Sequence, residues 1–260
     1  IYRVNDLTFG PLYFIPKPVD PRLITEVSAA VAKAAMESGV ARKSITNWDA
    51  YKNSLMQLLG QETVFTRKLH DTARLQPQRV VYAEGGHPSM MKAAVQAKAE
   101  GICFPILLGN PDRINRQAQR LKLDLSGIKI IDMRADKEQG RRATYAKHLA
   151  EKLARKGYTF QEAYDKMYER NYFGMMMVER GDADAFITGL YTKYSNTIKV
   201  ATEVVGVREG FHTFGTMHVV NSQKGTYFIA DTLINRHPDN NFLVDIARLS
   251  ANTVEFFNEK

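Results

Sequence analysis

The chain has 260 residues, 44% of them apolar and 25% charged, so it can bury a substantial core and does not have the composition of a disordered segment. Its 36 lysines and arginines exceed its 28 aspartates and glutamates, which gives a formal net charge of +8. This charge favours anionic partners such as nucleotides, CoA or carboxylates. Because basic residues alternate with acidic ones instead of forming a block, we expect no nucleic-acid partner.

Cysteine content and apolar run lengths indicate where the protein works. The single cysteine, Cys103, excludes an internal disulfide and is typical of a reducing compartment. No stretch approaches the roughly 18 uninterrupted apolar residues that a membrane span needs, and the start lacks a basic-then-apolar signal pattern. We therefore expect a cytoplasmic protein without membrane association. The six histidines show no metal-ligand spacing, so we expect no metal site in this stretch.

Residues 1 to about 75 have the pattern of helices. Asp20-Pro21 is typical of an N-cap followed by proline at the first helical position, and an apolar stripe then runs from Val27 to Ala35. A second helix precedes Gly60, and Thr46 is placed to cap it. This region is expected to be helical.

From Arg79 the pattern alternates between strand and helix. The alternation comprises strands at 80–83, 103–108 and 128–131, and helices near 88–100, near 111–121 and across 137–180. Repeated βα units predict an α/β protein, a three-layer αβα sandwich around a mostly parallel sheet. Two further strands, at about 213–221 and 226–231, predict an antiparallel hairpin added to that sheet.

Residues 181–199 form the first candidate site. They are read as a turn, a short apolar strand ending in Thr188-Gly189, and a polar loop opening a helix that carries Lys199. In α/β proteins, loops at carboxyl strand ends and helix N-termini present free N–H groups to anions. This segment is therefore a candidate ligand site.

Two other strand ends carry polar groups. Glu84-Gly85 opens a glycine-containing loop whose N–H groups can approach a phosphate, although the loop is neither G-x-G-x-x-G nor a P-loop and a plain tight turn is the simpler interpretation. Asp231 follows an apolar strand, where a carboxylate either caps the next loop or faces a ligand. The sequence alone leaves both alternatives open.

Five segments together resemble phosphate acetyltransferase (phosphotransacetylase). They are Arg79-Val-Val-Tyr-Ala-Glu-Gly-Gly-His87, Pro105-Ile-Leu-Leu-Gly109, Tyr172-Phe-Gly-Met-Met-Met-Val178, Gly181-Asp-Ala-Asp-Ala-Phe-Ile-Thr-Gly189 and Phe228-Ile-Ala-Asp-Thr-Leu-Ile-Asn235. Their order and spacing match over about 79–260. Upstream, Phe9-Gly-Pro-Leu-Tyr-Phe-Ile-Pro-Lys-Pro18 resembles the end of the catalytic part of large bacterial malic enzymes. The combination is similar to hybrid NADP-dependent malic enzymes with a phosphotransacetylase-like C-terminal region.

The resemblance implies a domain organisation and a place for cofactors. Residues 1–75 would be a helical connector, 76–165 a first lobe and 166–260 a second lobe truncated at its C-terminus, in a two-lobed phosphotransacetylase or isocitrate-isopropylmalate dehydrogenase-like fold. NADP and a divalent metal (Mg or Mn) would belong to an upstream domain, and the stretch itself would hold no cofactor. The start at Ile1 and the end soon after a helical pattern suggest a fragment of a longer chain.

The family's chemistry is the transfer of acetyl between CoA and phosphate, with arginines holding the phosphate charge. By the resemblance, one family arginine falls on Leu153 and another on Lys199, and the family's Ser- and Asp-bearing motif falls beyond residue 260. Lysine lacks the planar fork of arginine, and leucine lacks charge. We therefore expect an inherited acyl-CoA or phosphate pocket without a complete catalytic set. Its candidate residues are Thr188, Gly189, Lys193, Lys199, Arg155, Asp231, Asn235, Glu84 and Gly85.

The leading functional hypothesis is a regulatory and oligomerisation module of an NADP-dependent malic enzyme, the enzyme that decarboxylates malate oxidatively to pyruvate. The module would bind acetyl-CoA or a related anionic metabolite and form a homodimer or larger assembly. The first alternative is an active phosphate acetyltransferase in which Arg155 replaces the arginine missing at Leu153. The second is an assembly module without a ligand.

Overall fold

The computed structural model describes residues 22–59, 64–222, 225–235 and 237–257. The chain divides into two compact units, one formed by residues 1–68 with 220–227 and the other by 69–219 with 228–260. The predicted N-cap Asp20-Pro21 lies outside the described residues, as does the upstream segment that resembles malic enzymes.

The smaller unit is mainly helical in its described part. Its helices are α1 (Arg22–Glu37), α2 (Trp48–Leu59) and the first residues of α3 (Val64–Leu75). The side-chain oxygen of Asn47 accepts a hydrogen bond from the Ala50 N–H at 2.9 Å, so Asn47 caps α2. The predicted cap, Thr46, was wrong because it lies one residue too early to reach that N–H.

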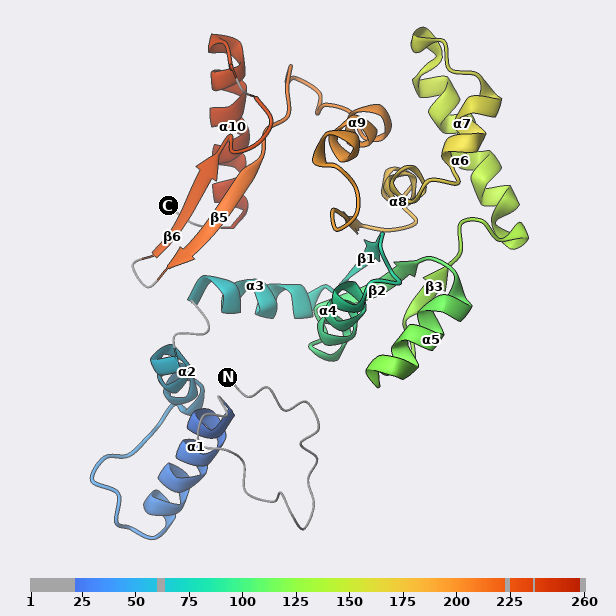
Figure 1. Ribbon diagram of the computed structural model, residues 1–260. Helices are drawn as coiled ribbons and strands as arrows, with labels where there is room; N and C mark the ends of the chain where they lie inside the picture. The colour runs from blue at the N-terminus through green and yellow to red at the C-terminus, as the bar shows by residue number, and fades with distance from the viewer. Residues whose placement is uncertain (1–21, 60–63, 223–224, 236, 258–260) are drawn as a thin grey trace. The chain divides into compact units, whose positions relative to one another are not determined.

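The larger unit contains the parallel sheet (Figure 1). In chain order its elements are β1 (Gln78–Tyr82), α4 (Pro88–Ala99), β2 (Cys103–Leu108), α5 (Pro111–Leu121), β3 (Lys129–Ile131), the 3₁₀ turn η1 (Asp136–Glu138), α6 (Gln139–Lys152), the 3₁₀ turn η2 (Ala154–Lys156), α7 (Phe160–Lys166), α8 (Arg170–Glu179), β4 (Ala185–Ile187) and α9 (Tyr194–Val204). The four strands are parallel in the order β3-β2-β1-β4. Val81 of β1 is paired with Ile106 of β2 on one side and with Phe186 of β4 on the other.

Helices cover both faces of this sheet, because successive apolar side chains of its strands point to opposite faces. Val81 and Ile106 pack into the core with α6, α8 and α9, whereas Tyr82 and Leu107 pack into a second core with α4 and α5. Figure 1 shows α4 and α5 on one side of the strands and α8 and α9 on the other. The predicted three-layer αβα architecture is confirmed.

The helices that follow β1 and β2 begin at well-capped turns. His87 precedes Pro88, and its ring Nδ1 accepts a hydrogen bond from the Ser89 N–H at 3.1 Å. Asn110 precedes Pro111 and caps α5 through its side-chain oxygen. Proline fits the first helical position because its missing N–H has no intrahelical partner there. These caps fix the loops at the carboxyl edge of the sheet.

The hairpin differs from its prediction. Strands β5 (Met217–Ser222) and β6 (Gly225–Ala230) form an antiparallel pair of their own and do not extend the parallel sheet. Neither strand has a buried residue in its described part, whereas a strand inside a sheet covered on both faces needs apolar contacts on each side. The last helix, α10 (Asn240–Phe256), starts after the cap residue Asp239.

The two expected lobes share the parallel sheet. Strand β4, from the expected second lobe, pairs with β1 of the expected first lobe, so residues 76–165 and 166–260 contribute to one sheet.

Over the described ranges, no helix is both long and apolar enough to cross a membrane.

Candidate functional site

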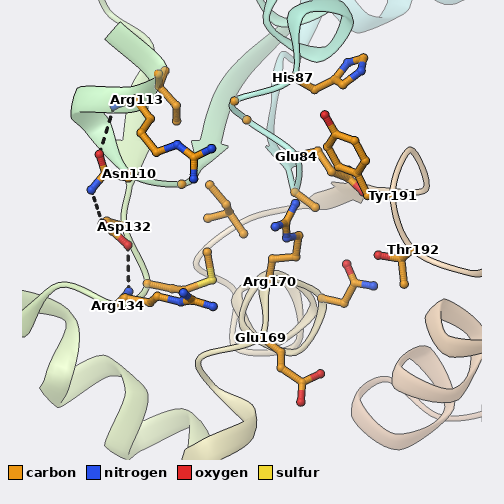
Figure 2. A pocket seen from close by; sticks show the side chains of 18 of the residues that line it. Glu84, His87, Asn110, Arg113, Asp132, Arg134, Glu169, Arg170, Tyr191 and Thr192 are labelled. Carbon is orange, nitrogen blue, oxygen red and sulfur yellow. Dashed lines mark hydrogen bonds between the residues drawn. The ribbon is translucent and has the colours of Figure 1, made fainter. Parts of the chain in front are cut away.

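A cavity of about 810 Å³ lies at the carboxyl edge of the parallel sheet (Figure 2). Its walls come from the loops that follow all four strands and from the first turn of α8. The chain passes from β1 through β2 to β3 on one side and then returns to place β4 on the other side of β1. Such a reversal opens a crevice between neighbouring strand ends, which is where α/β proteins bind ligands.

Glu84 is one of the residues that line this cavity, and it joins the loops that follow β1 and β4. Its side chain is almost completely buried, with 2% of the residue exposed. One carboxylate oxygen, Oε1, accepts hydrogen bonds from the Thr188 hydroxyl and the Gly189 N–H, each at 3.2 Å. The Thr188 hydroxyl also lies 2.9 Å from Oδ1 of Asn171 in α8. The loops after β1 and β4 are thereby tied together at the sheet edge.

Gly85 brings the first loop against β2. Its N–H donates to the Leu108 carbonyl at 3.2 Å, and a Cβ at this position would lie 2.7 Å from that oxygen and 2.8 Å from Leu107 Cβ. No side chain fits in this space without moving backbone. The loop that carries Glu84 therefore approaches β2 closely because residue 85 is glycine.

Three arginines line the cavity. Arg113 lies in the first turn of α5, Arg134 in the loop after β3, and Arg170 at the first position of α8. Figure 2 shows their side chains reaching into the cavity from these three elements. Their guanidinium groups form no hydrogen bond or ion pair with any residue that the structure describes. Together with the N-terminal end of α8, they make the cavity suitable for an anion.

A chain of hydrogen bonds fixes the backbone at two of these arginines. The backbone N–H of Arg113 donates to the Asn110 side chain at 3.1 Å, and the Asn110 amide donates to Asp132 at 3.4 Å. Asp132 in turn accepts from the backbone N–H of Arg134 at 3.0 Å (Figure 2). The chain of bonds fixes the backbone at both arginines. Their side chains remain free to reorient around a ligand.

Arg142 of α6 supports the same wall from behind. This arginine is 3% exposed and donates to the carbonyl oxygens of Met133 and Ala135 at 2.7 and 2.8 Å. These two carbonyls flank Arg134. Arg142 is therefore a structural clamp on the loop that presents Arg134, and it does not line the cavity itself.

Seven of the nine site residues expected from sequence fall into two groups in the structure. Glu84 and Gly85 line the cavity, and Thr188 and Gly189 contact Glu84 directly. The three expected cations are exposed and are not among the lining residues. They are Arg155 in η2, Lys193 at the start of α9 and Lys199 within α9. Nζ of Lys199 is 3.9 Å from the Glu203 carboxylate.

Leu153, the position to which the family resemblance assigned an arginine, lies in the core. It is buried together with residues of α6, α8 and α9. A charged side chain in this apolar core would lose its hydration, which is energetically costly. The core position accounts for an apolar residue at 153.

Asp231 and the neighbouring Asn235 hold a turn outside the cavity lining. Oδ1 of Asp231 accepts from the N–H and hydroxyl of Thr216 at 2.8 and 2.7 Å, and Oδ2 accepts from the backbone and side-chain N–H of Asn235 at 2.8 and 2.7 Å. Burial tends to raise the pKa of Asp231, but these four hydrogen bonds outweigh it and lower the pKa below its usual range. Asp231 thus caps the loop that follows β6, and its role in ligand binding stays a prediction.

Sequence reasoning missed Arg113, Arg134 and Arg170. Each is exposed, so none belongs to an apolar periodicity, and none sits in a named motif. The signal that could have found them was their position shortly after a strand or at the start of a helix. The strand-end loops at Glu84-Gly85 and Thr188-Gly189 had already been predicted as a candidate site. For metals, the residues that the structure describes include no group of three or more His, Cys, Asp or Glu side chains placed to hold an ion.

The fold and cavity define an α/β protein with a crevice, lined by three arginines, at the carboxyl edge of a parallel sheet. A family profile described as "Phosphate acetyl/butaryl transferase" matches residues 64–260. The chain therefore belongs to this family, and the predicted resemblance is confirmed.

Individual relatives show how the match is distributed. The chain is 36% identical over 257 residues to the NADP-dependent malic enzyme of Escherichia coli, which covers 98% of this chain and 34% of that enzyme. It is 32% identical over 192 residues to the phosphate acetyltransferase of Thermoanaerobacterium thermosaccharolyticum, covering 71% of this chain and 57% of the relative. The solved EutD phosphotransacetylase from Staphylococcus aureus covers 75% of this chain with 58% of its own, at a TM-score of 0.67 and 26% identity.

The malic enzyme match is partial in length. The chain spans about a third of the curated malic enzymes that it matches, and it corresponds to their C-terminal 34%. It is thus similar to a malic enzyme C-terminal region with a phosphotransacetylase-like domain.

Proposed function

We propose that this chain is a regulatory and oligomerisation module of an NADP-dependent malic enzyme and that its cavity binds acetyl-CoA or a related acyl-CoA. The single observation that carries the proposal is the convergence of Arg113, Arg134 and Arg170 on the cavity without partners among the described residues. Unpaired guanidinium groups at a strand-end crevice are suited to phosphate groups, which accept bidentate hydrogen bonds. The chain's excess of positive charge adds long-range attraction.

The size of the cavity agrees with a ligand larger than phosphate. Its volume of about 810 Å³ falls within the usual range for small-molecule and cofactor sites. Apolar walls from Leu108, Ile114 and Met133 accompany the arginines. A ligand with both a charged and an uncharged part, such as an acyl-CoA, uses both kinds of surface.

The residues at two family positions favour regulation over catalysis. Leu153 is buried and Lys199 lies outside the cavity lining, so the two positions to which the family resemblance assigned arginines do not supply phosphate contacts there. The second candidate is an active phosphate acetyltransferase, which family membership and the three unexpected arginines favour. Phosphate-dependent formation of acetyl phosphate from acetyl-CoA separates the two.

The remaining parts of the proposal concern the whole enzyme. Oxidation and decarboxylation of malate, NADP and a divalent metal would belong to the additional length found in the malic enzyme relatives, and the enzyme would act in the cytoplasm as a homodimer or larger assembly. Sedimentation that shows only a monomer at micromolar concentration would contradict the assembly part.

The binding test is a calorimetric titration of the chain with acetyl-CoA. Because a charge-assisted contact contributes about 1.5–3 kcal/mol, each of Arg113→Ala, Arg134→Ala and Arg170→Ala should weaken binding by roughly 10- to 100-fold. Arg116→Ala is the matched control, since Arg116 lies on α5 but does not line the cavity. Equal affinity in all four variants, or no binding by the folded chain at millimolar acetyl-CoA, would overturn the proposal.

The regulatory part needs the full-length enzyme. Malate oxidation should respond to acetyl-CoA in the unmodified enzyme, and Arg170→Ala should reduce that response in step with its loss of affinity, because linkage ties the two. Unchanged malate oxidation at saturating acetyl-CoA would leave binding without regulation and contradict this part.

A further inference from the structure

We infer that His87 and Tyr191 form a subsite for a nucleobase, so that the ligand of the cavity is a nucleotide derivative with its flat base against these two rings. The inference rests on the proposed function, because it concerns the same cavity. It goes further by separating acyl-CoA, which contains adenine, from acyl phosphates and other small anions, which contain no base.

The first argument is that both rings are open to a ligand. Tyr191 lies in the loop between β4 and α9, lines the cavity and is 67% exposed. His87 lines the same cavity and is half-buried. A single exposed tyrosine is common on protein surfaces, but here two aromatic side chains from different loops meet at the wall of one cavity.

The second argument is the angle between the two rings. Their centroids lie 5.3 Å apart and their planes are inclined by 74°. Such a pair forms a corner, because a flat ring that stacks on one of the two stands nearly edge-on to the other. Offset stacking and edge-to-face contact are the two arrangements that aromatic rings prefer. The pair therefore suits a third flat ring, and a nucleobase provides one.

The third argument is that hydrogen bonds hold the loops that carry these rings. The Glu84 carboxylate accepts from the Gly189 N–H at 3.2 Å, two residues before Tyr191, and the Glu84 carbonyl accepts from the His87 N–H at 2.8 Å. Nδ1 of His87 accepts from the Ser89 N–H at 3.1 Å, which orients the imidazole ring. Because these loops are ordered before binding, a ligand loses less conformational entropy in contacting them.

A third aromatic residue of the cavity wall, Tyr168, already has partners within the protein. Its ring centroid lies 4.7 Å from the guanidinium carbon of Arg142 and 5.8 Å from the ring centroid of Tyr164. In the part of the chain that the structure describes, the rings of His87 and Tyr191 contact each other instead. The base is therefore assigned to this pair.

The fourth argument is the position of the rings relative to the charges. Figure 2 shows His87 and Tyr191 on one side of the cavity and Arg113 and Arg134 on the other. Phosphate groups are expected at the arginines, which leaves the opposite side for an uncharged part of the ligand. A nucleotide has this layout, since its sugar separates the base from the phosphates.

The first test is a calorimetric titration of the whole chain with two probes, acetyl-CoA and S-acetyl-4′-phosphopantetheine. The second probe keeps the acyl arm and one phosphate but has no adenosine part. Because base–aromatic stacking changes affinity by roughly 5- to 150-fold, Tyr191→Ala should weaken acetyl-CoA binding by such a factor. The same variant should change binding of S-acetyl-4′-phosphopantetheine by less than about 3-fold.

Three further variants separate the ring from other effects of the substitution. Tyr191→Phe keeps the ring and should bind acetyl-CoA as the unmodified chain does. His87→Asn removes the second ring but keeps a side chain that can cap α4, and it should weaken acetyl-CoA binding selectively, like Tyr191→Ala. Tyr227→Ala is the matched control, since Tyr227 is exposed on β6 and does not line the cavity. It should change neither affinity.

A second measurement uses the unmodified chain and so does not depend on how a variant folds. Adenosine 3′,5′-bisphosphate is compared with an analogue that carries hydrogen in place of the base, and the analogue should bind at least about 5-fold more weakly. Equal binding of these two compounds, or an equal effect of Tyr191→Ala on both probes of the first test, would refute the role of the rings alone. Failure of the unmodified chain to bind acetyl-CoA would refute the proposed function as well.

Discussion

The guanidinium carbon of Arg142 lies 4.7 Å from the centroid of the Tyr168 ring, while the same guanidinium donates to the carbonyls of Met133 and Ala135. Tyr168 precedes α8 and Met133 follows β3, and both residues line the cavity. A cation over an aromatic ring is attracted by the ring's negative face. One buried cation thus connects the segment before α8 to the loop after β3.

Arg142→Ala should destabilise the fold by about 2–4 kcal/mol, because it leaves two carbonyl acceptors without their donor and removes a buried side chain. Urea denaturation measures the loss. Arg142→Lys keeps the charge but offers fewer donors and should be intermediate. Arg134→Ala, at an exposed position on the same loop, should stay within about 0.5 kcal/mol of the unmodified protein. A loss as large for Arg134→Ala would show that the clamp is not the cause.

A methyl group added at Gly174 in α8 has no space. Its Cβ would lie 2.2 Å from a ring carbon of Phe186 and 3.2 Å from a methyl of Leu108, and both side chains belong to the core. Overpacking should outweigh the helix-propensity gain, so Gly174→Ala should destabilise by about 1–3 kcal/mol. Gly140→Ala in α6 meets nothing within 4 Å and should be neutral or stabilising by up to about 1 kcal/mol. Thermal unfolding of both variants tests the contrast, which reversed signs would disprove.

The ion pair between Asp184 and Arg79 makes stability depend on pH. The Arg79 side chain donates to both Asp184 oxygens and its backbone N–H to one, which lowers the Asp184 pKa to about 2. Since the unfolded value is about 3.9, the stabilisation is complete above that pH and is lost as pH falls towards 2. Asp184→Asn should therefore be less stable at neutral pH, with the difference from the unmodified protein shrinking below about pH 4. A difference constant from pH 7 to 2 would exclude the linkage.

The Lys199→Ala variant tests whether the family resemblance places the ligand site correctly. If Lys199 contacted the ligand, as the family resemblance implies, Lys199→Ala would weaken acetyl-CoA binding by roughly 10- to 100-fold. The structure places its side chain 62% exposed, beside Glu203 and away from the cavity lining. We therefore expect less than about a 3-fold change for Lys199→Ala, against the larger loss for Arg170→Ala. Calorimetry on both variants decides, and a greater loss at Lys199 would move the anion site towards α9.

Much of the fold could be predicted because its signals are local. The ends of β2 and α5 agree with the sequence prediction, since Asn110-Pro111 is both a strand terminator and a helix start. The placement of the hairpin could not be read in this way. The strand patterns of Met217–Ser222 and Gly225–Ala230 predict that these two strands pair with each other. Nothing in their sequence specifies whether the pair also joins the four-stranded sheet.

For the cavity, the residues at strand ends could be predicted from the sequence, whereas the exposed arginines could not. Thr188-Gly189 and Glu84-Gly85 were found because loops after parallel strands meet at one edge. Arg134 and Arg170 have no such pattern, and their convergence depends on the packing of α6 and α8. That packing is fixed by contacts such as that of the Tyr145 ring of α6 with the Phe173 ring of α8, which only the three-dimensional structure shows.

The hydrogen bond between Glu84 and the Gly189 N–H joins residues 105 positions apart. The βα units between them can form from neighbouring residues, whereas this bond requires β4 to return and dock beside β1. Long loop closures are slow compared with helix formation. During refolding, recovery of helical signal should therefore precede recovery of ligand binding, and the interval between them measures how long the chain exists as a helical intermediate without a completed cavity.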